Sequence, residues 1–147
     1  MSSWKKICCP VDFSETSRVA LETAAGLARR EEAELTLLFV LETPAAVAEF
    51  PILPAEFLEQ TIREVERKLD RWRAEAEHLR GAPAKAEVVS GSPAHEIVRY
   101  AREGGFDLVV VGTHGRTGIR HMVLGSVAER VIREAHCAVL VVRRSGK

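Results

Sequence analysis

The chain has 147 residues, of which 46% are hydrophobic and 29% are charged, as in an ordinary folded domain. We therefore expect a single domain over residues 1–147. Its 21 Lys and Arg residues balance 21 Asp and Glu residues, so the chain lacks the basic field that a general nucleic-acid binder needs. It has no apolar run of roughly 18 residues to span a membrane and too short an apolar start for a secretory signal, which favours the cytoplasm.

The three cysteines predict no disulfide framework and no metal site. Cys8 and Cys9 are adjacent, so on a strand their side chains point to opposite faces. The sequence contains no CxxC and no other spacing typical of a metal site. We expect the thiols, including that of Cys137, to be small buried hydrophobic groups in a reducing compartment.

Apolar runs that suit buried strands alternate with segments of helical periodicity, which is typical of βαβ units and a parallel sheet. Ser14 is a suitable N-cap for the first helix, and Ser92 followed by Pro93 opens the third helix in a similar way. In chain order, we expect a strand at 5–11, a helix at 14–30, a strand at 34–41, a helix at 55–80, a strand at 84–89, a helix at 92–104, a strand at 107–111, a helix at 125–135 and a strand at 137–142.

The helix at 55–80 carries one apolar stripe with alternating steps of four and three residues. We expect this stripe to pack on the sheet; a partner helix is the alternative. Three prolines between residues 42 and 54 predict a loop before this helix. The stripe consists of Leu58, Ile62, Val65, Leu69, Trp72, Ala76 and Leu79.

The strands are nearly continuous apolar runs, as expected when helices cover both faces of a sheet. Right-handed crossovers then favour a doubly wound five-stranded α/β fold. The strand orders 3-2-1-4-5 and 2-1-3-4-5 are both common, and the apolar pattern does not choose between them. In the first order, ligands bind where the first and fourth strands end, which directs attention to residues 10–14 and 112–126.

The loop after the fourth strand has glycines at 112, 115, 118 and 125, and Ser126 opens the next helix. Glycine lets a main chain approach a ligand closely, and amides at a helix N-terminus favour phosphate. Residues 112–128 contain two Arg, two His and no acid. The loop therefore indicates a phosphate site, although glycines that serve only tight turns would give a similar pattern.

Other nucleotide and hydrolase motifs are missing from this loop. No Lys occurs between Lys85 and Lys147, so a Walker P-loop is excluded there, and GxGxxG and GxSxG are absent. A phosphoacceptor receiver domain would place an Asp at the end of the third strand, where this chain has Val89, Ser90 and Gly91.

The glycine spacing resembles the ATP-binding branch of the universal stress protein (UspA-like) family, which carries G-x2-G-x9-G-[ST]. Gly112, Gly115, Gly125 and Ser126 match with the correct gaps. The segments PVDFS at 10–14, DLVVVGTHG at 107–115 and CAVLVV at 137–142 also match, so the resemblance covers essentially the whole chain. It implies strand order 3-2-1-4-5, a Rossmann-like fold related to adenine nucleotide alpha hydrolases, and ATP at the switch point.

The resemblance also implies roles for individual residues. Asp12 would lie close to the ribose hydroxyls, although an Asp at this position could instead cap the first helix. Arg116 and Arg120 lie in the variable part of the motif, and we expect them near the phosphates only because of their charge. Mg²⁺ would arrive with the phosphates. Carried over by position, the expected ATP contacts are Pro10, Val11, Asp12, Val40, Val111, Gly112, His114, Gly115, Gly125, Ser126 and Val127.

Asp12 is the only acidic residue evident in the two loops of the expected site, and no general base is apparent. Since phosphoryl transfer needs a group that orients the nucleophile, we expect a nucleotide-dependent regulatory protein without fast catalysis. A slow ATP hydrolase or nucleotidyl transferase on the same fold is the alternative. A third possibility is an adapter that binds no nucleotide and uses residues 42–54 or the helix at 55–80 for partners.

The fifth strand is apolar, and an exposed strand of this kind at a sheet edge invites pairing. A two-fold antiparallel pairing of Cys137 to Arg143 would close the edge and give a homodimer, which the resemblance also implies. An edge shielded within a monomer is the alternative. Many relatives have Cys-Pro where this chain has Cys137 and Ala138, so this chain has an additional main-chain N–H.

Overall fold

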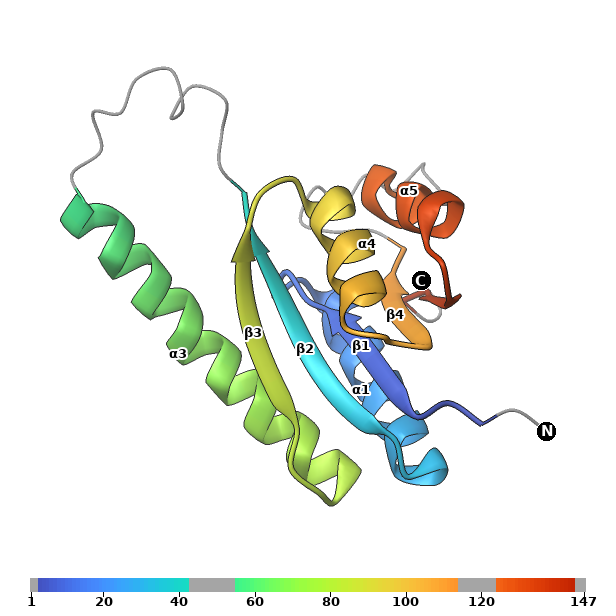
Figure 1. The fold of residues 1–147 in the computed structure, drawn as a ribbon. Coiled ribbons are helices and arrows are strands. Elements are labelled where there is room, and N and C mark those ends of the chain that lie inside the picture. The colour runs from blue at the N-terminus through green and yellow to red at the C-terminus, as the bar shows by residue number, and fades with distance from the viewer. Residues whose placement is uncertain (1–2, 43–54, 114–123, 145–147) are drawn as a thin grey trace.

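Strands and helices alternate along the chain in the structure, a computed structural model that describes residues 3–42, 55–113 and 124–144 (Figure 1). The expected elements are confirmed, with bounds that differ by at most one residue. The elements are β1 (Lys6–Pro10), α1 (Glu15–Glu31), β2 (Glu34–Leu41), α3 (Ala55–Arg80), β3 (Lys85–Ser90), α4 (Pro93–Glu103), β4 (Leu108–Gly112), α5 (Ser126–Glu134) and β5 (Ala138–Val142).

The five strands form one parallel sheet in the order β3-β2-β1-β4-β5. Of the two orders that the apolar pattern left open, the one implied by the family resemblance is therefore confirmed. β1 is central, with Ile7 beside Leu35 of β2 on one side and beside Leu108 of β4 on the other. The chain proceeds outward from β1 to β3 and then returns to β4, so the topological switch lies between β1 and β4.

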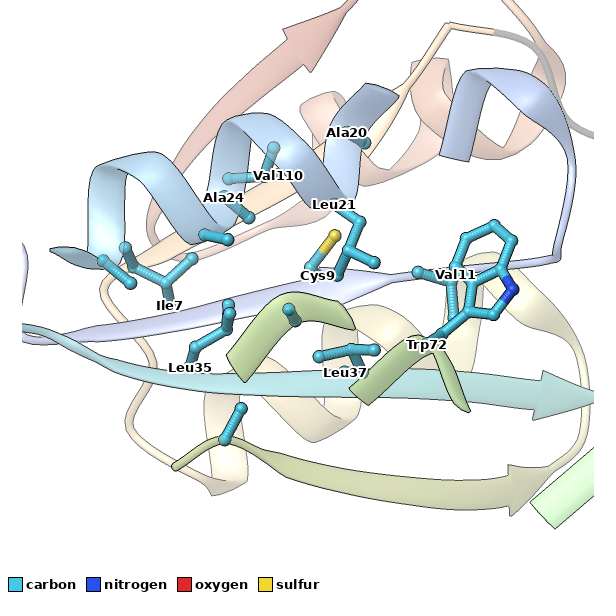
Figure 2. Packing of buried hydrophobic residues seen from close by; sticks show 14 of the residues in the cluster. Ile7, Cys9, Val11, Ala20, Leu21, Ala24, Leu35, Leu37, Trp72 and Val110 are labelled. Atoms are coloured by element: carbon cyan, nitrogen blue, oxygen red, sulfur yellow. The ribbon is translucent and has the colours of Figure 1, made fainter. Parts of the chain in front are cut away.

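Helices cover both faces of the sheet and enclose two separate apolar cores. α1 and α3 bury one core, part of which Figure 2 shows, and α4 and α5 bury the other. Cys9 lies in the first core and Cys8 in the second, as predicted for neighbours on a strand. Burial raises the pKa of Cys9 to about 12 and that of Cys8 well above the ordinary thiol value, so both are neutral packing groups.

The helix starts agree only partly with the expected caps. Ser14 is the N-cap of α1, and its Oγ accepts the Ser17 N–H at 3.2 Å, as predicted. Ser92 occupies the N-cap position of α4, but its side chain makes no capping hydrogen bond. Ser92 therefore has the expected N-cap position without the capping hydrogen bond, and Pro93 favours the helical start.

Only the middle of the α3 stripe is buried, through Leu69, Trp72 and Ala76. These residues belong to the core shared with α1 and β2, which confirms packing on the sheet for this part of α3. Leu58 and Leu79 are 39% and 40% exposed. A helix of 26 residues is about 39 Å long, whereas a strand of 6 residues spans about 20 Å. α3 thus extends beyond the neighbouring β3, which cannot bury the whole apolar stripe (Figure 1).

Candidate functional site

The switch point lies at the carboxyl ends of β1 and β4, where α1 and α5 begin. We call this region the switch-point site, and its described parts are residues 10–14, 112–113 and 125–126. Two helix N-termini therefore lie at the carboxyl ends of the strands. N–H groups in a first helical turn have no intrahelical acceptor, and the helix dipole adds partial positive charge there. The described part of the switch-point site is therefore suited to an anion.

The β1–α1 turn is held by one hydrogen bond to β2 and by several short-range hydrogen bonds. The Val11 N–H donates to the Leu38 carbonyl at 2.8 Å and continues the sheet past β1. The Ser14 N–H donates to Asp12 Oδ1 at 3.0 Å, which is an Asx turn. The Asp12 N–H donates to Ser17 Oγ at 3.3 Å. Asp12 is therefore not the cap of α1; its carboxylate shapes the turn at the end of the central strand.

Phe13, which sequence analysis did not single out, has a left-handed main chain within this turn. Its φ is 67°, a conformation that costs a residue other than glycine on the order of 1–3 kcal/mol. Its ring stacks on Phe39 with centroids 4.8 Å apart and meets the edge of Trp72 at 5.2 Å. The available signal in the sequence was a large apolar residue between Asp12 and Ser14, in a turn that is otherwise polar.

Gly112 lies against the first turn of α1. A Cβ atom on Gly112 would stand 2.6 Å from Thr16 Cγ2 and 3.1 Å from the Thr16 carbonyl carbon and oxygen. The motif spacing predicts that a ligand approaches this glycine. The structure gives it a packing function as well, because a side chain here would push α1 away from β4.

Gly125 is joined to the end of β4 through Thr113. The Gly125 N–H donates to the Thr113 carbonyl at 2.5 Å, and the Thr113 N–H donates to the Val142 carbonyl at 2.9 Å. The first and last glycines of the motif thus lie at two chain positions that the fold holds together. Gly125 has a φ of −74°, which any residue adopts, so conformational freedom does not explain this glycine. Ser126 follows it as the exposed first residue of α5.

Some of the expected contact residues are buried in the cores, and others lie outside the residues that the structure describes. Val11 is 5% exposed and Val111 is 4% exposed, so the main chain, rather than these side chains, is available to a ligand. Val40 and Pro10 are partly buried, and Val127 is exposed. The expected contacts at His114, Gly115 and Arg116, and the expected position of Arg120 near the phosphates, lie outside the described residues.

An ion pair that the sequence did not predict joins the segment after β5 to the first turn of α1. Arg144, which follows β5, places Nη1 2.8 Å from Oε2 of Glu15 in the first turn of α1. Both side chains are exposed, so the pair adds little stability. No local signal could have found this pair, because the two residues are separated by most of the chain.

Residues 3–42, 55–113 and 124–144 contain no cluster of three or more His, Cys, Asp or Glu side chains that could hold a metal ion. Within the same ranges, no helix is long and apolar enough to cross a membrane.

Comparison with known proteins gives consistent matches over nearly the full length. The family model "Universal stress protein family" matches residues 3–143. Universal stress protein MJ0531 of Methanocaldococcus jannaschii is 39% identical over 98% of this chain and 85% of its own length. The solved structure of MJ0577, from the same organism, has a TM-score of 0.86 at 34% identity and covers 99% of this chain and 100% of its own. A further universal stress protein structure has a TM-score of 0.74 at 25% identity and covers 98% and 100%.

Sequence, strand order and three-dimensional similarity thus agree over the same residues. This chain belongs to the universal stress protein family.

Proposed function

We propose that this chain binds ATP at the switch-point site and acts as a nucleotide-dependent regulatory module of the stress response, without fast catalysis. The observation that carries the proposal is the hydrogen bond from Gly125 to Thr113, which holds both ends of the glycine motif beside the β1–α1 turn. Main-chain amides at the start of α5 are then available for a phosphate chain. In this proposal the chain acts in the cytoplasm.

Each part of the nucleotide is assigned to a different part of the site. Asp12 accepts hydrogen bonds from the ribose hydroxyls, since a carboxylate can accept several at once. Pro10, Val40 and the main chain of Val11 line the adenine, and the main chain of Val111 lies beside the ribose. The phosphates lie against the main chain at Gly112 and Gly125, the N–H groups in the first turn of α5 and the Ser126 hydroxyl, with Mg²⁺ held through the phosphates. The proposed further contacts are His114, Gly115, Arg116 and Val127.

A relative supports the ligand class. The universal stress protein structure with 25% identity to this chain was solved in complex with cAMP, an adenine nucleotide. A triphosphate carries more negative charge than cAMP, and the two helix N-termini at the switch-point site favour that charge. We therefore propose ATP as the ligand.

The described acidic groups at the site support binding rather than turnover. The Asp12 carboxylate accepts the Ser14 N–H within the turn, and the Glu15 carboxylate pairs with Arg144. Neither arrangement is that of a base held ready for an attacking water. ATP would instead act by linkage, stabilising the folded form to which it binds by about 2.7 kcal/mol at 100 times the dissociation constant.

Calorimetric titration with Mg²⁺-ATP tests the proposal, with Ser126→Ala as the site variant. Loss of a hydroxyl bond to a charged phosphate is expected to weaken binding by about 10-fold, since such bonds contribute roughly 1.5 kcal/mol or more. Ser92→Ala is the matched control, because Ser92 also precedes a helix at the carboxyl end of a strand and its side chain makes no capping hydrogen bond. It should bind ATP like the wild type.

Two results would contradict the proposal in different ways. If ATP produces neither heat nor a thermal shift, the adapter hypothesis replaces nucleotide binding. If phosphate is released steadily at about 10 per second, a typical enzyme rate, the hydrolase alternative replaces the regulatory role.

We also propose that the functional unit is a homodimer that pairs through Cys137–Arg143. β5 is an edge strand, and its residues from Val139 to Val142 are only partly buried. Leu140→Arg would place charge on this apolar edge, and light scattering should then report a shift from dimer to monomer. Val88→Arg on β3, the opposite edge strand, is the control and should leave the mass unchanged. A wild-type chain that is monomeric at micromolar concentration would refute this interface.

A further inference from the structure

The β1–α1 turn is connected to α3 through the side chain of Phe13. α3 lies on the face of the sheet that α1 also covers, and Figure 2 shows Trp72 of α3 on the same face as Val11 at the end of β1. The Phe13 ring contacts Phe39 of β2 and Trp72 of α3, and the Lys68 ammonium stands 4.9 Å above the ring centroid. Three elements distant in sequence thus meet at one residue of the turn.

These contacts explain how an unfavourable main-chain conformation persists. The φ of 67° at Phe13 is one that L residues rarely adopt, so the turn would relax if local forces alone acted on it. The hydrogen bonds among Asp12, Ser14 and Ser17 join residues only two to five positions apart. Packing of the partly buried ring against β2 and α3 is the long-range contact made by Phe13 itself, and it holds the conformation.

α3 also contacts the first turn of α1 directly. The Arg18 guanidinium lies 4.6 Å from the centre of the Trp72 ring and forms an ion pair with Glu75. Trp72 is therefore in contact both with the turn and with the helix that follows it. A movement of α3 near Trp72 would reach the Asp12 carboxylate and the N-terminus of α1 together.

We infer that Phe13 is a positioning residue: it holds Asp12 and the first turn of α1 in the geometry that binds a nucleotide, and it makes the middle of α3 a structural part of the site. The inference rests on the proposed nucleotide function. It assigns to α3 a role that its sequence pattern, an amphipathic stripe, does not indicate. Coupling is reciprocal, so nucleotide binding should in turn protect α3 near Trp72 from opening.

Phe13→Leu tests the inference, because leucine keeps an apolar side chain and loses the ring contacts. ATP affinity is expected to fall about 5- to 30-fold, the change that accompanies a modest loss of preorganisation. Trp72→Leu should give a similar loss, although the proposed nucleotide contacts include no residue of α3. Phe106→Leu is the matched control. The Phe106 ring stacks on Tyr100 at 5.5 Å and lies 4.8 Å from the Lys6 ammonium, near the amino ends of the strands and away from the switch-point site. This variant should lose stability and keep its affinity within about twofold.

Hydrogen exchange without nucleotide provides a second readout, independent of ATP. The amides of Asp12, Ser14 and Ser17 should exchange several-fold faster in Phe13→Leu than in Phe106→Leu when the two are compared at equal global stability. A folded Phe13→Leu variant with wild-type affinity and wild-type exchange in the turn would overturn the inference. If the wild-type chain itself binds no ATP, the proposed function fails, and the exchange rates then decide alone whether Phe13 holds the turn.

Discussion

Gly112→Ala is expected to lower the free energy of unfolding by about 1–3 kcal/mol, the usual cost of forcing an extra methyl group into a packed site. The new Cβ would stand 2.6 Å from Thr16 Cγ2 and 3.1 Å from main-chain atoms of Thr16. A main chain at the start of a capped helix cannot rotate away as a flexible side chain does, so the first turn of α1 must shift. Because that turn belongs to the switch-point site, ATP affinity should fall as well. Urea unfolding and calorimetric titration measure the two effects.

Gly26→Ala is the control for this prediction. Gly26 lies within α1, and a Cβ there would meet no atom within 4 Å. Alanine at this position should stabilise the chain by about 0.5–1 kcal/mol, because glycine is the poorer helix former. Equal unfolding midpoints for the two variants would show that the contact between Gly112 and Thr16 has no energetic weight.

Asp12→Ala is expected to reduce ATP affinity by about 10- to 100-fold, since hydrogen bonds to a charged group contribute roughly 1.5–3 kcal/mol. The variant removes both the proposed acceptor for the ribose and the Asx turn that binds the Ser14 N–H. Asp12→Asn separates the two, because an amide oxygen can still accept the Ser14 N–H while the charge is lost. We expect Asp12→Asn to restore the stability of the wild type and only part of its affinity. Titration calorimetry and thermal unfolding give the two numbers.

Asp107→Ala controls for the loss of a carboxylate that accepts main-chain hydrogen bonds. The Asp107 carboxylate accepts hydrogen bonds from the N–H groups of Lys5 and Lys6 at 2.9 and 3.1 Å, at the amino ends of β1 and β4 and away from the site. This variant should lose stability without losing ATP affinity. Comparable affinity losses in Asp12→Ala and Asp107→Ala would mean that the effect is global, and the assignment of Asp12 to the ribose would be withdrawn.

The local rules of helix and strand formation predicted most elements because each depends on neighbours in sequence. The N-cap at Ser14 is a contact over three residues, and the structure confirms it. Ser92 shows the limit of the same rule, since the residue type and position were right but its side chain makes no capping bond. For α3, periodicity predicted the buried stripe, whereas the length of β3 decided how much of the stripe is covered.

The candidate site divides in the same way. The motif spacing directed attention to Gly112 and Gly125, and their ligand roles remain predictions. That Gly112 also packs on Thr16, and that Gly125 donates to Thr113, are contacts between segments whose approach no spacing reveals. Phe13 is the clearest case, because its φ and its ring contacts with β2 and α3 exist only once the sheet has formed.

By itself, the sequence determined the alternation of strands and helices, the burial of both sheet faces and, through the glycine spacing, the family. These properties follow from side-chain polarity, from short-range geometry and from a motif that is read in order. Only the tertiary structure decided what α3 covers, what Phe13 contacts and which atoms enclose Gly112. Such contacts join residues from separate elements, and their free energy depends on the packing of the whole sheet and its helices rather than on any stretch of the chain.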